Sequence, residues 1–285
     1  MAYLEDHWCG LEWTPWVKFN SSRSEWKRLQ AKSGVYRVRP VDRPFLMYIG
    51  QTGRSLRVRL GELRSNTLSD VMPYDDPHTA APGLWAWRQE EHWDYECSAA
   101  PTSLSERNRK ALECYLLWQY RLEKNESTSC NHGRFHKNYI KSSLRAKHLR
   151  GRRLSPSEKR NPSGGPSHPP LRIRGEPSDC NWMGIEWTEM RPLDSGLGLV
   201  PGSASLYRLR NLKFRLLYIG ETTNLRNRLA AHRRNYREDH EVKFSYALPD
   251  TSREYELREL ENDLIGGYYS FSKSAPDDQF GRNRG

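Results

Sequence analysis

The chain has 285 residues, of which 36% are apolar, and its 46 Arg and Lys outnumber its 35 Asp and Glu to give a formal charge of +11. No run of about 18 apolar residues is present, which excludes a membrane-spanning helix, and the first residues show neither the basic nor the apolar region of a secretory signal. Arg and Lys are spread along the chain, and a basic chain favours polyanions. We therefore expect nucleic acid as the partner, no membrane, and a cytoplasmic location.

The first predicted elements form a hairpin followed by a helix. Residues 34–40 alternate apolar and polar side chains, and residues 44–50 are a short apolar run that ends in Gly, so both are predicted to be strands. A helix is predicted to begin at Leu56, with Ser55 as its N-cap. A further strand and a helix over about 105–122 complete this part of the chain.

The same order of elements returns in the second half. Strands are predicted over 205–211 and 213–220, a helix after the N-cap Asn224, and a last helix over 252–268. Each half is therefore predicted to be a small α/β or α+β sandwich, with a short antiparallel three-stranded sheet flanked by helices.

Sequence blocks also repeat in one order, which is the mark of an internal duplication. The repeated blocks are GLEWT at 10–14 with GIEWT at 184–188, GVYRV at 34–38 with SLYRL at 205–209, YIG at 48–50 and 218–220, and LECYLLWQYR at 112–121 with LENDLIGGYY at 260–269. We predict two tandem domains, 1–150 and 181–285. Between them, 151–180 is a basic Pro/Gly/Ser-rich linker. Its early Arg/Lys stretch either lies along phosphates or is simply solvated.

The ordered set of motifs resembles the GIY-YIG endonuclease superfamily. The first domain contributes GVY at 34–36, YIG at 48–50, LRVR at 56–59, Glu113 and Asn131. The second domain contributes SLY at 205–207, YIG at 218–220, LRNR at 225–228, His232 and Glu261. The resemblance covers nearly the whole chain apart from the linker, and it implies a DNA endonuclease with one site in each domain.

The resemblance also implies a role for each candidate residue. Tyr36 and Tyr207 would be the base-like residues near the attacking water, and Tyr48 and Tyr218 would orient phosphate or water. Arg59 and Arg228 would stabilise charge, and Glu113 and Glu261 would bind Mg²⁺. Asn131 and His232 complete the set. Hard carboxylate oxygens suit Mg²⁺, and we expect Mn²⁺ to substitute. A Tyr can act as a base only if adjacent cations lower its pKa.

Neither domain matches the family pattern in full. In the first domain the helix position that holds a His in the second domain is Leu63. In the second domain Ser205 stands at the first Gly position, and no residue aligns cleanly with Asn131; Asp277 or Asn283 are the candidates to replace it. Taken singly, each motif residue also suits an ordinary strand or helix surface. Their joint occurrence, in order and twice, favours a functional site.

Several aromatic and sulfur-containing residues lie outside these motifs. Five cysteines with no paired spacing indicate reduced thiols. A zinc site formed by Cys130, His132 and His136 is an alternative that lacks a second ligand pair at a useful spacing. The insertion in the first domain contains Trp85, Trp87 and Trp93, which either reach a base or, as we prefer, fill the core. Trp13 and Trp187 are expected to pack across the hairpin rather than contact DNA.

Two sites suit a substrate with two strands. The leading hypothesis is a Mg²⁺-dependent endonuclease that acts on double-stranded DNA as a monomeric pseudo-dimer, each domain cutting one strand. A restriction enzyme that reads a short or modified site would fit this arrangement. The alternatives are a structure-specific repair or recombination nuclease, one catalytic domain with the other as a DNA-binding module, and a basic protein that binds nucleic acid without cutting.

Overall fold

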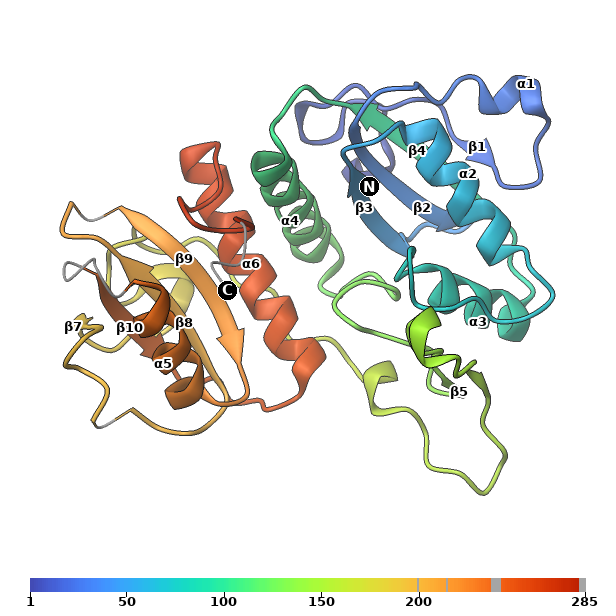
Figure 1. Cartoon of the computed structure of the whole chain (residues 1–285). Coiled ribbons are helices and arrows are strands. Elements are labelled where there is room, and N and C mark those ends of the chain that lie inside the picture. The colour runs from blue at the N-terminus through green and yellow to red at the C-terminus, as the bar shows by residue number, and fades with distance from the viewer. Residues whose placement is uncertain (199, 214, 237–241, 282–285) are drawn as a thin grey trace. The chain divides into compact units, whose positions relative to one another are not determined.

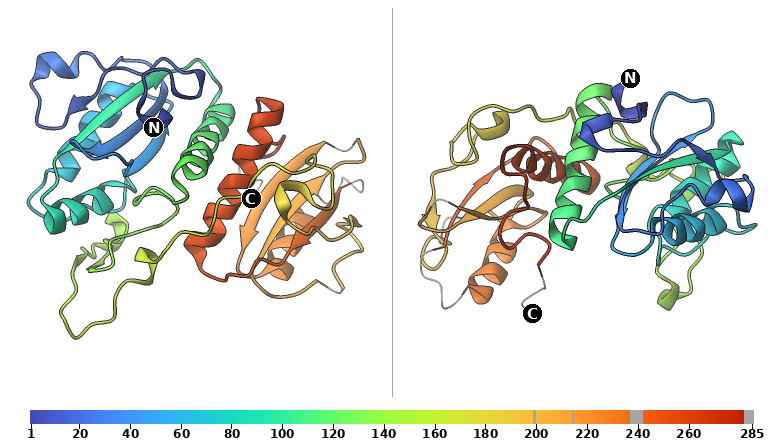
Figure 2. Two further views of the ribbon diagram at one scale, coloured as in Figure 1. Left: turned by 180° about the vertical axis from the view of Figure 1, so that it is seen from behind. Right: turned by 90° about the horizontal axis from the view of Figure 1, so that it is seen from above.

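The computed structural model describes residues 1–198, 200–213, 215–236 and 242–281. The chain divides into two compact units (Figure 1), and Figure 2 shows them from behind and from above. Unit one comprises Met1–Arg109 and Glu126–Pro166, and unit two comprises Lys110–Asn125 and Ser167–Gly285.

Unit one is built on an antiparallel sheet of four strands in the order β1-β4-β2-β3. The strands are β1 (Val17–Lys18), β2 (Gly34–Pro40), β3 (Tyr48–Thr52) and β4 (Tyr95–Pro101). The α-helices are α1 (Arg23–Trp26), α2 (Leu56–Thr67) and α3 (Ala81–Glu91), and a two-stranded sheet pairs β5 (Tyr139–Ile140) with β6 (Arg152–Arg153). Short 3₁₀ turns lie at η1 (Ala2–Leu4), η2 (Trp8–Gly10), η3 (Arg145–Lys147) and η4 (Pro162–Gly164).

Unit two repeats this plan, with strands in the order β7-β10-β8-β9. The strands are β7 (Arg191–Pro192), β8 (Ser205–Arg210), β9 (Leu216–Thr222) and β10 (Lys243–Ala247). The helices are α5 (Leu225–Asn235) and α6 (Glu254–Ser272), with a 3₁₀ turn at η5 (Trp182–Gly184). Helix α4 (Glu106–Lys124) has its residues from Lys110 onward in unit two.

The helices that follow the YIG strands bury one apolar face against the sheets. In unit one Leu56, Leu60 and Leu63 of α2 join the core, and in unit two Leu225 and Leu229 of α5 do the same. These residues stand three or four positions apart, so each set lies on one helix face. At about 25 cal/mol per Å² of apolar surface, burial of this kind contributes more to stability than helix propensity does.

The predicted mixed α/β fold is confirmed, and so are the two N-caps. Ser55 accepts a hydrogen bond from the backbone N–H of Val58, and Asn224 accepts one from Asn227. The prediction of three strands per sheet is wrong, because each unit has a sheet of four strands. The additional strands, β1 and β7, are only two residues long, and no alternation can be read over two residues.

A buried Arg occupies the same place in each sheet. The guanidinium of Arg37 lies 4.3 Å from the ring centre of Trp13, and that of Arg208 lies 4.5 Å from the ring centre of Trp187. Both guanidinium groups donate to backbone carbonyls, and burial lowers the pKa of each to about 9. The two Trp residues of the GLEWT and GIEWT blocks therefore pack inside the protein, as expected.

The segment predicted to be a linker is divided between the units. Residues 151–166 belong to unit one and residues 167–180 to unit two. Hydrogen bonds and ion pairs hold the first part in place, for example Arg152 with Glu158 at 2.6 Å and the backbone N–H of Asn161 with the carbonyl of Lys137 at 2.8 Å. A composition poor in apolar residues therefore folds here through polar contacts.

In unit two a buried ionic network joins α4 to α6. The guanidinium of Arg121 on α4 donates from Nε to Asp263 at 2.8 Å and lies 3.3 Å from Glu259, and all three side chains are fully buried. The second oxygen of Asp263 accepts from the backbone N–H of Leu171, and Glu259 accepts from that of His168. The network thus anchors three segments that lie far apart in the sequence.

Removal of one member should be costly because it leaves a buried charge without its partner. We expect Asp263→Ala to lower the free energy of unfolding of unit two by about 3–5 kcal/mol. The matched control is Glu254→Ala on the same helix, which breaks the exposed pair with Arg258 and should cost at most about 0.5 kcal/mol. Urea unfolding followed by circular dichroism measures both, and equal small effects would contradict the role given to the network.

Candidate active site

The candidate site of unit two begins with a contact between neighbouring strands. The pairing of β8 with β9 sets Tyr207 opposite Gly220. A Cβ atom at Gly220 would lie 2.4 Å from the hydroxyl of Tyr207, so no larger residue fits under the ring. Unit one repeats this contact, because Tyr36 stands opposite Gly50 and a Cβ there would lie 2.8 Å from its hydroxyl. The Gly of each YIG motif is therefore required by the Tyr across from it.

Helix α5 brings two side chains to the Tyr207 hydroxyl. Arg228 donates from Nε to this oxygen at 2.8 Å, and His232 Nε2 lies 3.0 Å from it. Arg228 also donates from Nη2 to the hydroxyl of Tyr218 on β9, at 3.2 Å. Arg228 and His232 stand four positions apart and so share a helix face. The structure thus brings together Tyr207, Tyr218, Arg228 and His232.

The direction of these hydrogen bonds follows from the protonation of His232. Burial, reinforced by the charge of Arg228, lowers the pKa of His232 to about 4, so the imidazole is neutral at pH 7. Because the Tyr207 oxygen accepts from Arg228, its own proton is available for Nε2 of the neutral ring. Tyr207 is then a phenol that donates to His232.

A base-like role for Tyr207 requires a lowered pKa, and the structure shows the opposite shift. Burial raises the pKa of Tyr207 well above its ordinary value, and the nearby Arg228 opposes this shift without overcoming it. Tyr207 is also fully buried. His232 is buried as well, so the side chains of the cluster that reach solvent in this structure are those of Tyr218 and Arg228.

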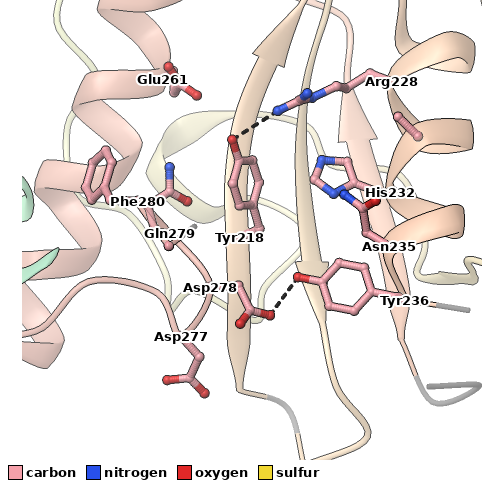
Figure 3. A pocket seen from close by; sticks show the side chains of 12 residues that line it. Tyr218, Arg228, His232, Asn235, Tyr236, Glu261, Asp277, Asp278, Gln279 and Phe280 are labelled. Carbon is pink, nitrogen blue, oxygen red and sulfur yellow. Dashed lines mark hydrogen bonds between the residues drawn. The ribbon is translucent and has the colours of Figure 1, made fainter. Parts of the chain in front are cut away.

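A pocket of about 670 Å³ opens beside this cluster (Figure 3). Its lining comes from β9, α5, α6 and the segment after α6, and consists of Tyr218, Arg228, Ala231, His232, Asn235, Tyr236, Glu261, Asp277, Asp278, Gln279, Phe280 and Gly281. Two of the acidic groups are held by partners, since Asp278 accepts from the Tyr236 hydroxyl at 2.6 Å and Asp277 pairs with Arg215 at 2.9 Å. Glu261 differs from both.

Glu261 is half-buried and has no cationic partner among the described residues. Its carboxylate accepts a hydrogen bond from the backbone N–H of Glu221 at 3.3 Å. Burial raises the pKa of Glu261 to about 8, and the nearby carboxylate of Glu221 adds to the shift. A carboxylate that is costly to ionise alone is well suited to bind a cation, so the donor chemistry of Glu261 fits Mg²⁺. No group of three His, Cys, Asp or Glu with metal-ligand geometry occurs among the described residues.

Gln279 lines the candidate site and was not identified from the sequence motifs. In unit one the side chain of Asn131 accepts from the backbone N–H of Ile49 at 3.0 Å and donates to its carbonyl at 2.8 Å. In unit two Gln279 accepts from the N–H of Ile219, the corresponding residue of the second YIG, at 2.9 Å. Both side chains are buried carboxamides that hold the YIG strand.

Of the two candidates to replace Asn131, Asp277 does not take this position. The backbone N–H of Asp277 donates to Leu216, and its carboxylate pairs with Arg215. Asn283 lies outside the described residues. The equivalence of Gln279 and Asn131 follows from the backbone hydrogen bonds just before them. The N–H of Cys130 donates to the carbonyl of Met47, and the N–H of Asp278 donates to the carbonyl of Leu217.

The candidate residues of unit one are arranged differently. The rings of Tyr36 and Tyr48 lie 6.0 Å apart, as in unit two. Arg59, however, donates from Nη1 to the carbonyl of Pro77 at 3.0 Å, on the connection between α2 and α3. Leu63, at the position of His232, packs into the core. Glu113 lies at the eighth position of α4, as Glu261 does in α6, but on the part of α4 that belongs to unit two.

The alternatives outside the motifs are resolved by packing. Trp87 and Trp93 stack in parallel with ring centres 5.6 Å apart and pack against the core of unit one, as preferred. The zinc alternative has no support in the described residues, where no metal-ligating cluster is found. Burial raises the pKa of Cys130 to about 12. None of the five cysteines forms a disulfide.

Comparison with known proteins gives one family. Residues 203–272 match the family model of the GIY-YIG catalytic domain. The match lies in unit two, spans β8 to α6, and does not cover unit one. It indicates a nuclease of the endonuclease kind. No curated protein matches the chain significantly. In the described part of the chain, no helix has the length and apolar character needed to cross a bilayer.

A buried neutral His makes the stability of unit two depend on pH. In the unfolded chain His232 takes up a proton near its ordinary pKa of about 6.5, whereas in the folded chain it does so only near pH 4. Its contribution is therefore complete above about pH 6.5 and is lost as pH falls toward 4, by about 3 kcal/mol. Unfolding of wild type and His232→Gln at pH 7 and pH 4 measures the difference, and parallel losses in the two proteins would contradict it.

Proposed function

We propose that the chain is a Mg²⁺-dependent DNA endonuclease and that the pocket of unit two is a catalytic centre. The proposal is supported above all by Arg228, which is hydrogen-bonded to both Tyr207 and Tyr218 at the edge of a pocket that also contains Glu261. The cation of Arg228 and the carboxylate of Glu261 thus face the same space. This is the charge pattern that a phosphodiester and a metal ion require together.

Arg228 and Tyr218 are the residues proposed to hold the scissile phosphate. The guanidinium donates hydrogen bonds in a fixed planar geometry that suits phosphate oxygens. Because Tyr207 and Tyr218 already orient Arg228 in the free protein, little reorganisation is needed when phosphate charge develops. Tyr218 lines the pocket, so its hydroxyl is within reach of the same group.

Glu261 is the residue proposed to hold Mg²⁺. When bound, the ion would supply a Lewis acid for the phosphate and its leaving oxygen. A single protein carboxylate suits a cation that keeps several of its waters. The proton of Tyr207 is directed at His232, and Arg228 would stabilise the phenolate oxygen left behind if that proton moved.

The repeat of the fold supports a double-strand break as the product. Unit one has the same strand order, the same Tyr–Gly contact and a carboxamide on the same strand. We propose that it is a second domain of the same kind, so that one monomer acts in the cytoplasm as a pseudo-dimer on duplex DNA. A restriction role, with a short or modified site, would use this arrangement.

A second candidate function is favoured by the contacts of Arg59. This side chain donates to Pro77, and no His is present at Leu63. Unit one would then bind and position DNA while unit two cuts. The two candidates differ in their product, because one active unit nicks a duplex and two active units cut both strands.

Supercoiled plasmid with Mg²⁺ separates the two candidates. Wild type is compared with Glu261→Gln and Glu113→Gln, and with Glu254→Gln as a control on the exposed face of α6. If both units cut, wild type yields linear DNA, each variant at the first two positions yields only nicks, and the control behaves as wild type. If Glu113→Gln behaves as wild type while Glu261→Gln has no activity, unit one is a binding module. Plasmid with modified cytosines, run in parallel, tests the restriction role.

Arg228→Ala should lower the rate of cleavage by unit two by about 10²–10³-fold, because one preorganised donor to the phosphate is removed. The control is Arg234→Ala, which removes an exposed Arg from the same helix and should change the rate much less. Single-turnover cleavage of a short duplex measures both rates. A rate for Arg228→Ala within a few-fold of wild type would count against the assigned site.

A further inference from the structure

The excess positive charge of the chain is concentrated in one segment of unit one. Residues 134–160 contain ten Arg and Lys and a single Glu, a net charge of +9. The other residues hold 36 Arg and Lys against 34 Asp and Glu. Although basic residues occur throughout the sequence, acidic residues nearly balance them in the rest of the chain taken together.

The centre of this segment is a closed arm. Strands β5 and β6 pair Tyr139 with Arg153, and the intervening residues fold back between them (lime in Figure 1, at the label β5). We call residues 139–153 the basic arm. Within it Ser143 exchanges hydrogen bonds with Leu149, and the backbone N–H of Gly151 donates to Ser142. A Cβ at Gly151 would lie 2.1 Å from the carbonyl of Ile140, so the arm closes only with Gly here.

The insertion of unit one supports the basic arm. Lys141 pairs with Asp75 at 2.6 Å, and Arg150 donates to the carbonyl of Met72 at 2.6 Å. The ring of Tyr74 lies 4.3 Å from the guanidinium of Arg150 and 5.6 Å from that of Arg145. The arm is therefore held in one conformation before any partner binds, which lowers the entropic cost of binding.

The basic arm combines exposed cations that have no carboxylate partner in the described part of the chain with exposed leucines. Arg145, Lys147 and Arg150 are exposed, and none of them has a carboxylate partner among the described residues. Leu144 comes directly before Arg145 and Leu149 directly before Arg150, and Leu149 is 67% exposed. A solvated loop that serves only as a connection has no reason to hold leucines outward on a rigid frame.

We propose that the basic arm is a DNA-binding element that docks into a groove of duplex DNA. Arg145 and Lys147 contact phosphates, and Leu149 contacts sugars or base edges inside the groove. This inference rests on the proposed function and adds to it the surface by which unit one grips the substrate. An anionic membrane would also attract such a surface, but the nuclease-type pocket in the same chain favours duplex DNA.

The test measures DNA binding separately from cleavage. In the full chain carrying Glu261→Gln, the affinity for a short fluorescent duplex is followed by anisotropy from 50 to 300 mM salt. The double variant Arg145→Gln/Lys147→Gln should lower the slope of log K against log salt by about 2, one for each phosphate that the arm no longer neutralises. At about 100 mM salt this corresponds to binding at least tenfold weaker. Leu149→Ser should weaken binding while leaving the salt slope unchanged.

The matched control is Lys27→Gln/Arg28→Gln, which removes the same charge from two exposed neighbours of unit one outside the arm. An equal change of slope in both double variants, or no change in either, overturns the proposal. So does binding to phosphatidylserine vesicles without binding to the duplex. If wild type fails to cut plasmid while the arm variant still binds DNA more weakly, the nuclease proposal fails and the arm stands.

Discussion

The ring of Tyr207 lies on the backbone of Gly220, and the other groups of the candidate site take their positions from this contact. With the ring in this place, the hydroxyl is directed at α5, where Arg228 and His232 reach it from one helix face. Arg228 can then also reach Tyr218 on the neighbouring strand. A side chain at position 220 would displace the ring and separate these hydrogen bonds. The YIG motif is thus a packing requirement as much as a chemical one.

Comparison of the two units separates the contacts that both share from those found in only one. The buried Arg on its Trp ring, the Tyr over its Gly and the carboxamide on the YIG strand occur in both. The groups next to the hydroxyl differ, because unit one has Leu63 in place of His232 and directs Arg59 to Pro77. Residues that support the sheet are therefore the same in kind, whereas residues that would handle phosphate and protons have diverged.

Local interactions account for what could be predicted from the sequence. The N-caps Ser55 and Asn224 bond to residues three positions away, and the leucines of α2 and α5 show the helical period. Tyr218, Arg228, His232 and Glu261 lie on elements whose spacing is regular, so their convergence at a single pocket could be anticipated from the order of the motifs. The prediction was weakest where a contact depends on the path of the chain.

Gln279 and the segment 151–180 illustrate that weakness. A Gln reaches the backbone of Ile219 as an Asn reaches Ile49, but the different residue type, longer by one methylene, hides the equivalence in the sequence. The segment was predicted to be a linker because it has few apolar residues, but polar contacts tie it to residues far away in the chain, such as Arg153 to Glu90 and the backbone N–H of His168 to Glu259. The protonation of Tyr207 also depends on burial, which no motif reports.

The concentration of charge in the basic arm bears on how the protein finds its substrate. Three of the six basic residues on the arm, Arg145, Lys147 and Arg150, have no carboxylate partner among the described residues, and the charges outside residues 134–160 nearly balance, so the electrostatic field of unit one is uneven. Such a field turns a diffusing molecule before contact and raises the rate of productive encounters with a polyanion. The benefit is confined to about a Debye length, close to 8 Å at physiological salt. On the proposed function, the arm would orient the protein toward DNA before contact, and the rate of association would fall as ionic strength rises.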